Sequence, residues 1–123
     1  MDTREPIAFP RPEGKSGTGR GTSPAIVAFN RRELQDILNL YGRMVVAGHW
    51  KDYAIDDSPE IATFSIYRRA SEMPLFRIVK SPALARRQGT YAIMGLGGHV
   101  LKRGHSLPQL LTFFEKRRFE LVE

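Results

Sequence analysis

The sequence predicts an α+β domain in which two main helices pack on one face of a mostly antiparallel sheet of four to five strands. Three observations lead to this fold class. Four segments rich in β-branched and aromatic residues follow one another with short connections between them. A strongly amphipathic helix pattern precedes these segments, and a second helix pattern closes the chain.

Residues 1–24 differ in composition from the rest of the chain. The run FPRPEGKSGTGRGTSP is dense in proline and glycine and has almost no branched apolar residue. Such a segment buries too little apolar surface to offset the entropy lost on ordering. We therefore expect a disordered tail over residues 1–24 and a single folded domain over residues 25–123.

The domain is predicted to open with a short apolar strand over Ala25–Phe29, followed by a helix over residues 30–47. Asn30 can cap this helix, and Glu33, three positions later, completes a capping-box pattern. Gly48 is placed to end it. Apolar residues at helical spacing predict one buried stripe, made of Leu34, Ile37, Leu38, Tyr41, Met44 and Val45.

The middle of the chain is predicted to form an antiparallel meander. Residues 49–60 are expected to form a loop or irregular extension, because Asp56 to Pro59 carry a clear turn signal. The glycine-rich run at 95–98 predicts a tight turn between the last two strands, and residues 82–89 can hold a helical turn. The four strands are expected within residues 61–69, 74–81, 90–95 and 99–103.

A closing helix is predicted over residues 106–118. Ser106 can cap it, Gln109 stands at the capping-box position, and Pro108 is tolerated in the first turn. Its predicted buried face consists of Leu107, Leu110, Leu111 and Phe114.

Composition excludes several classes of function. The chain has no cysteine, which excludes disulfides, thiolate metal sites and cysteine catalysis. The N-terminus has no apolar segment typical of a secretory signal, and no run approaches the ~20 apolar residues of a membrane span. We expect a cytoplasmic protein that does not act at a membrane and has no cofactor.

The motif-like stretch GLGGHVLKRGH is interpreted as a turn and a strand. Its glycines lie between two strands, whereas phosphate-binding loops need a glycine turn followed by a helix. His99 and His105 flank the strand and are too far apart to share a metal ion when it is extended. The position of His49 is open. No metal ligand and no catalytic residue is predicted, and the acidic residues between Asp52 and Glu60 are interpreted as solvated turn residues.

The charge balance is basic, with 19 Lys and Arg against 13 Asp and Glu. Adjacent basic pairs recur near the ends of the predicted elements, at 31–32, 68–69, 86–87, 102–103 and 117–118. Strand alternation also makes Tyr67, Arg77, Tyr91 and Lys102 candidates for one sheet face, which would form a basic platform with aromatic rings. The candidate residues for anion or nucleic-acid binding are Arg68, Arg69, Arg77, Arg86, Arg87, Lys102, Arg103, Tyr67 and Tyr91.

These features favour a non-enzymatic binding or regulatory protein whose basic surface takes an acidic protein partner. The alternative is a protein that binds RNA or single-stranded DNA. A more remote alternative is an enzyme with a pocket containing His49, His99 or His105. A homodimer through the uncovered sheet face is a further expectation, with Leu75, Val79 and Ile93 as its apolar contacts.

Four blocks, FNRRELQDILNLYGRMVVAGHWKDYAID, FSIYRRASEMPLFRIVKSP, LARRQGTYAIMG and LKRGHSLPQLL, stand in this order in the chain. Together they resemble a family of small alphaproteobacterial proteins known only as a domain of unknown function. The resemblance spans about residues 26–120 and implies a bacterial cytoplasmic protein. It implies no activity, ligand or catalytic residue.

Overall fold

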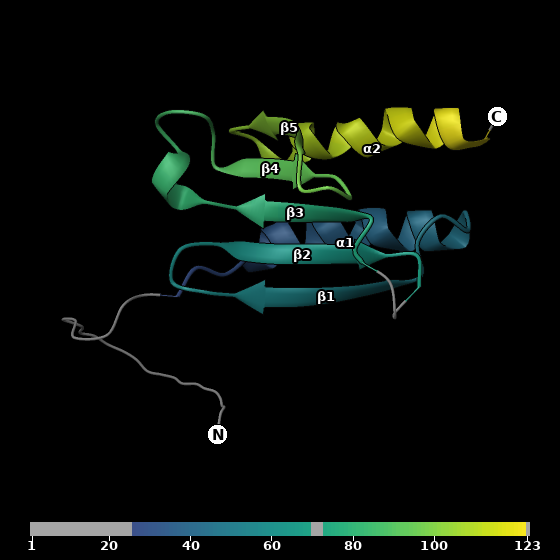
Figure 1. The fold of residues 1–123 in the computed structure, drawn as a ribbon, viewed down its shortest axis with the longest axis horizontal. Coiled ribbons are helices and arrows are strands. Elements are labelled where there is room, and N and C mark those ends of the chain that lie inside the picture. The colour runs from purple at the N-terminus through teal and green to yellow at the C-terminus, as the bar shows by residue number, and fades with distance from the viewer. Residues whose placement is uncertain (1–25, 70–72, 123) are drawn as a thin grey trace, which may run out of the picture.

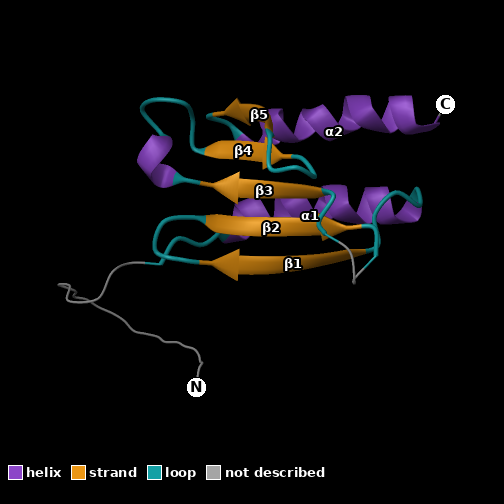
Figure 2. Ribbon diagram, viewed as in Figure 1, coloured by secondary structure: helices purple, strands orange, loops and turns teal. Residues whose placement is uncertain are grey.

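Figure 1 shows one layer of strands and one layer of helices in the computed structural model, which describes residues 26–69 and 73–122. The helices α1 (Arg31–Val46) and α2 (Leu107–Val122) lie behind the sheet, on the same face (Figure 2). Neighbouring strands are antiparallel and follow chain order. The predicted α+β fold is therefore confirmed. The strands are β1 (Asp52–Asp57), β2 (Ala62–Tyr67), β3 (Phe76–Lys80), β4 (Tyr91–Met94) and β5 (Val100–Gly104).

Two of the predicted assignments were wrong, one of a strand and one of a loop. In the described part of Ala25–Phe29, the only β-pairing is one isolated bridge, between Val27 and Ser58. The segment at 49–60, expected to be a loop, contains β1. Its three aspartates obscured the alternation of Tyr53 and Ile55, which face the helix side opposite Ile66 and Phe64. Because β1 lies at the margin of the sheet, its other positions face water and tolerate carboxylates.

The first helix begins as predicted. The Asn30 side chain accepts a hydrogen bond from the Glu33 amide at 2.8 Å, and Glu33 Oε1 accepts one from the Asn30 amide at 2.7 Å. Gly48, at a φ of +85°, follows the last turn. The buried stripe is rotated from the predicted one, since Leu40 is buried while Leu38 is 37% exposed.

The core lies between the helix layer and the helix-facing side of the sheet. The inward residues of β2 are Ala62, Phe64 and Ile66, and all three are inaccessible to solvent. The Trp50 ring packs edge-on against Phe114 with 5.1 Å between centroids, which joins the end of α1 to α2. The four residues predicted for the inner face of α2 are all buried: Leu107, Leu110, Leu111 and Phe114.

The connections also follow the predictions. The turn between β4 and β5 is closed by a hydrogen bond from the Gly95 amide to the His99 carbonyl. A 3-10 turn, η1 (Pro82–Leu84), occupies the connection between β3 and β4. The Gln109 amide lies 3.4 Å from Ser106 Oγ, as expected for a helix cap. Among the described residues, no helix is both long enough and apolar enough to cross a membrane.

A buried ionic cluster links the helix layer to the sheet. Glu33 Oε1 accepts a hydrogen bond from Lys80 Nζ of β3 at 2.9 Å, and Oε2 accepts one from the Tyr91 hydroxyl of β4. Lys80 Nζ also donates to the Ala28 carbonyl at 2.9 Å. The cluster thereby fixes α1 and the segment before it to two strands.

The environment of Glu33 favours its ionised form. Burial raises the pKa of the Glu33 carboxyl, but hydrogen bonds from Tyr91, Lys80 and Asn30 together lower it by more. The pKa of Glu33 therefore lies below its ordinary value. For Tyr91, burial and the Glu33 carboxylate raise the pKa to about 12.

Glu33→Gln is expected to lower the free energy of unfolding at neutral pH by about 2–3 kcal/mol, because Lys80 loses its charged partner. The pKa of Glu33 is lower in the folded chain than its ordinary value of 4.5. Its contribution is therefore present above that value and is lost as pH falls through the folded pKa. Urea unfolding at neutral pH and at about pH 3 should show the difference between wild type and variant shrinking in acid.

Asp36→Asn is the control for this prediction. It removes an exposed pair in which Arg32 Nε and Asp36 Oδ1 are 3.6 Å apart. Its free energy of unfolding should stay within about 0.5 kcal/mol of wild type. A difference between Glu33→Gln and wild type that does not change with pH would contradict the assignment.

Candidate binding surface

The sheet face away from the helices, here called the open face, is defined by strand alternation. Because the inward residues of β2 face the helices, Thr63, Ser65 and Tyr67 face the other way. Register extends this face across the sheet, with Ser65 opposite Arg77, Arg77 opposite Met94, and Met94 opposite Val100. A second row runs through Thr63, Val79, Ala92 and Arg103.

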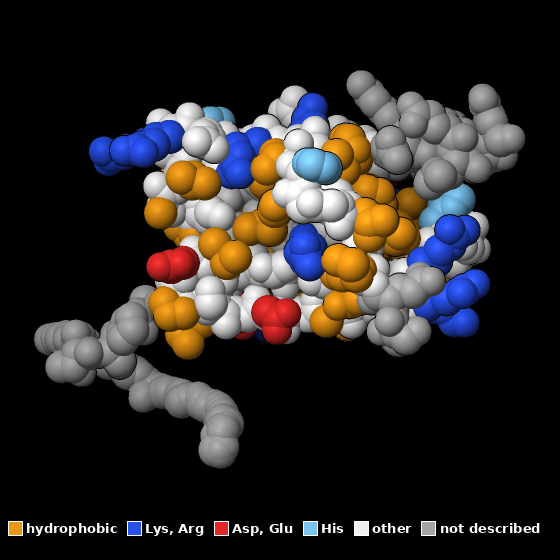
Figure 3. Space-filling view, in the orientation of Figure 1, with side chains coloured by type: hydrophobic (Ala, Val, Ile, Leu, Met, Phe, Trp, Pro, Cys, Tyr) orange, Lys and Arg blue, Asp and Glu red, His pale blue; other side chains and the backbone are white. Residues whose placement is uncertain are grey.

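The open face combines apolar and basic groups. Figure 3 views this face and shows hydrophobic side chains around and between Lys and Arg groups, with the visible carboxylates toward the β1 side. Ser65, Val79 and Ala92 are buried, whereas Val100 is 48% exposed. The groups available to a partner are therefore mainly those around the buried positions: Thr63, Tyr67, Arg77, Met94, Val100 and Arg103, with Asp52 and Asp56 at the β1 margin of the face.

The structure brings together only part of the predicted platform. Tyr67 and Arg77 share the open face, but Tyr91 and Lys102 lie on the helix side. Tyr91 is opposite Lys80 and donates its hydroxyl proton to Glu33. The prediction that all four share one face was therefore wrong, because alternation within a strand does not give the register between strands.

The expected apolar contacts of a homodimer also divide between the two faces. Val79 faces the open side and is 8% exposed. Ile93 is fully buried beneath the helices, so its assignment to the uncovered face was wrong. Met94 and Val100 were not among the predicted contacts but lie on the open face.

The basic pairs do not meet at one rim. Arg68 and Arg69 follow β2, and Arg86 and Arg87 lie in the connection after η1, at the opposite end of the sheet (Figure 1). Arg103 faces the open side from β5, whereas Lys102 points to the helix side. The side chains of residues 117 and 118 lie outside the described part. Of the predicted basic residues, Arg77 and Arg103 are therefore the ones that strand register places on the open face.

Arg103 is the most unusual of these cations. Its Nη1 atom is buried and has no hydrogen-bond partner in the described part of the chain. A buried donor without an acceptor costs about 1–3 kcal/mol, and more when it is charged. Because Nη1 is inaccessible, a bound molecule would have to contact the other nitrogens of this half-exposed side chain.

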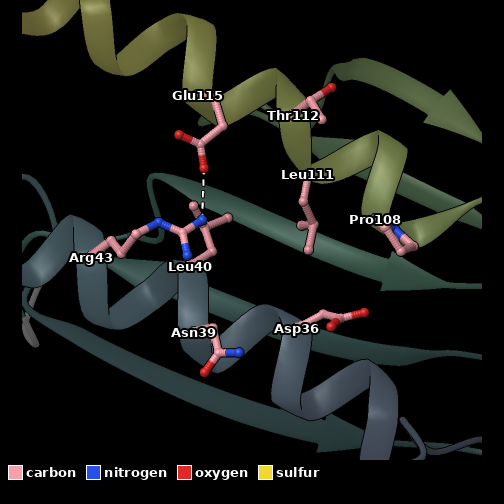
Figure 4. Close-up of a pocket in the computed structure, with 8 residues that line it drawn as sticks. All are labelled: Asp36, Asn39, Leu40, Arg43, Pro108, Leu111, Thr112 and Glu115. Atoms are coloured by element: carbon pink, nitrogen blue, oxygen red, sulfur yellow. Dashed lines mark hydrogen bonds and ion pairs between the residues drawn. The ribbon is translucent and has the colours of Figure 1, made fainter.

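A groove lies between the two helices, as Figure 4 shows. Buried Leu40 and Leu111 form part of its lining. Arg43 Nη2 and Glu115 Oε2, 2.7 Å apart, connect the two helices across it. Because this guanidinium already has a carboxylate partner, we interpret the groove as a helix–helix contact.

The three histidines are far apart in the fold, and Figure 3 shows them as separate groups. His49 follows α1, and its Nε2 is buried without a partner among the described residues. His105 lines an open groove with Glu33 and Asp36 at the start of both helices. The Glu33 carboxylate there is occupied by Lys80 and Tyr91. Within the described residues, no three His, Asp or Glu side chains are grouped to hold a metal ion.

Comparison with known proteins places the chain in a family. Residues 27–111 match the model of a family described as "Protein of unknown function (DUF2794)". No curated protein and no solved structure matches the chain significantly. The resemblance to a family of unknown function is confirmed, and the match assigns no activity or ligand.

Gly89 anchors the connection that carries Arg86 and Arg87, and Gly89→Ala is expected to destabilise the protein. Its φ is +109°, and a Cβ there would lie 2.6 Å from the backbone of Gly104. The expected loss in free energy of unfolding exceeds about 1 kcal/mol, measured by urea unfolding.

Gly42→Ala is the matched control for this substitution. Gly42 lies within α1, and a Cβ there would meet no atom within 4 Å. It should stabilise the protein by about 0.5–1 kcal/mol. Equal effects of the two substitutions would contradict the anchoring role of Gly89.

Proposed function

The chain belongs to the DUF2794 family of proteins of unknown function, and we propose that it is a non-enzymatic binding protein whose open face takes an acidic segment of a protein partner. The observation that carries the proposal is the placement of Arg77 and Arg103 on the open face, among the apolar positions Ala92, Met94 and Val100. A carboxylate is the acceptor that best matches a guanidinium, because its two oxygens fit the planar fork of N–H groups.

The arrangement around Arg103 supports a protein partner. Arg77 and Arg103 stand in adjacent rows of the open face, with Ala92 and Met94 of β4 between their strands. A segment carrying two carboxylates separated by an apolar side chain would match this pattern. Apolar contact excludes water from the charged pairs and thereby strengthens them.

The net charge supports the same class of partner. The chain carries a formal charge of +6 at pH 7. A field of this sign accelerates the approach of an acidic partner and disfavours basic ones around Arg77 and Arg103.

The nucleic-acid alternative receives less support from the open face. Single-stranded nucleic acids bind through bases stacked on several aromatic rings. Tyr67 is the one aromatic residue among the described open-face positions, because Tyr91 lies on the helix side. The remaining basis for this alternative is electrostatic, and salt dependence tests it.

Replacing both Arg77 and Arg103 with Ala is expected to weaken binding of a labelled peptide of alternating Glu and Leu by about tenfold or more. Fluorescence anisotropy measures the affinity. The matched control is Arg31→Ala with Arg32→Ala, which removes the same charge at the exposed start of α1. Control affinity should stay near that of wild type.

The same titrations with a single-stranded RNA distinguish the alternatives. Binding of RNA that is tighter than that of the acidic peptide, and that falls steeply with salt, would replace the proposal with the nucleic-acid function. Equal loss of peptide binding in the two double variants would show a general charge effect and would contradict a site on the open face.

A further inference from the structure

The sheet extends beyond the helix layer on the β1 side. In Figure 1, α1 lies behind β2 and β3, and no helix lies behind β1. Tyr53 and Ile55, which point to the helix side, consequently remain 40% and 41% exposed. The described helices therefore leave this margin of the sheet incompletely covered.

The outer edge of β1 offers backbone hydrogen-bonding groups. Among the described strands, β1 is the first of the sheet and pairs on one side only, with β2. In the described chain, Val27 forms an isolated antiparallel bridge with Ser58, the residue that follows β1. The Tyr53 amide donates to Asp52 Oδ1 at 2.9 Å. An edge strand with free backbone groups can accept a further strand from another chain.

An apolar shelf lies on the helix side of this edge. The Tyr53 ring packs edge-on against Tyr41 of α1 with 4.9 Å between centroids. Leu38 and Val45 stand three and four positions from Tyr41 on the same side of the helix, and are 37% and 39% exposed. Tyr53, Ile55, Leu38 and Val45 thus form an exposed apolar surface beside the strand.

The other side of the same strand is acidic. Asp52 and Asp56 point to the open face, with Ala54 between them. The ion pairs found among the described residues involve neither of them, nor Asp57. Asp57 is on the helix side of β1, opposite Ala62, and its pKa is raised by desolvation and by the charge of Asp56.

The charge of this edge decides between two occupants. A second copy paired through β1 would bring the aspartates of both strands into one ribbon, and like charges on paired strands repel. A basic strand would neutralise them. We propose that the β1 edge binds an extended basic segment of a partner protein, in which Lys or Arg alternates with large apolar residues.

The geometry of a β-strand determines which residues should alternate in the partner segment. Alternate side chains of an added strand point to opposite faces of the sheet. The apolar set would cover the shelf formed by Tyr53, Ile55 and Leu38, and the basic set would meet Asp52 and Asp56 on the open face. The site is separate from the one proposed around Arg77 and Arg103, and it takes the opposite charge. The protein would then join an acidic partner and a basic partner.

The test uses the full chain and a labelled peptide of alternating Lys and Ile, compared with a peptide of the same composition in which the two residues form separate blocks. The alternating peptide is expected to bind at least about tenfold tighter, because only its pattern fits both faces. Hydrogen exchange should slow at the β1 amides when it binds. Equal affinity for the two peptides, or protection outside β1, would overturn the proposal.

Two variants with matched controls locate the site. Asp56→Asn should weaken binding several-fold, whereas Asp36→Asn, on α1, should not. Ile55→Ser should also weaken it, whereas Val46→Ser, at a position 90% exposed at the end of α1, should not. Thermal unfolding checks that each variant is folded, and Asp56→Asn tests the site even if Ile55→Ser unfolds.

Equal affinities of Asp56→Asn and wild type would overturn the proposal, as would a dimer in gel filtration that Asp56→Asn strengthens, because the edge would then belong to a second copy. The acidic peptide that probes the open face is a separate measurement. Each of the two proposals can therefore fail alone.

Discussion

The arrangement of the two layers depends on one buried carboxylate. Glu33 accepts hydrogen bonds from its own helix cap, from Lys80 of β3 and from Tyr91 of β4. A buried carboxylate is stable only when its oxygens are paired, so the cluster favours an α1 position that brings all three donors together. That position places α1 over the middle of the sheet. The face opposite α1 and the margin at β1 are left to other contacts.

The two surfaces left by this packing have opposite charge. The open face presents Arg77 and Arg103 among apolar residues, and the β1 edge presents Asp52 and Asp56. Opposite charges at separate places on one small domain give selectivity, because a partner attracted to one surface is repelled at the other. Together, the two proposals describe a protein that holds two different segments.

Whether a histidine, carboxylate or arginine in these grooves is available for chemistry depends on the partners that it already has in the fold. His105 lines the same groove as Glu33, and an imidazole with a carboxylate is a combination that acid–base catalysts use. The carboxylate is already bonded to Lys80 and Tyr91, so it stabilises the fold and is not available to exchange a proton with His105. Likewise Arg43 in the helix groove is paired with Glu115.

The sequence by itself determined the features that depend on neighbours along the chain. The capping box at Asn30 and Glu33, the turn at Gly95 and the inner face of α2 could all be predicted, because local hydrogen bonds and helical periodicity specify them. Tertiary structure decided the rest. Strand register placed Tyr91 beneath the helices and Arg103 on the open face, and alternation within each strand carries no information about register. The strand β1 was not predicted, because its aspartates are typical of a turn. The pairing with β2 is what makes this segment a strand.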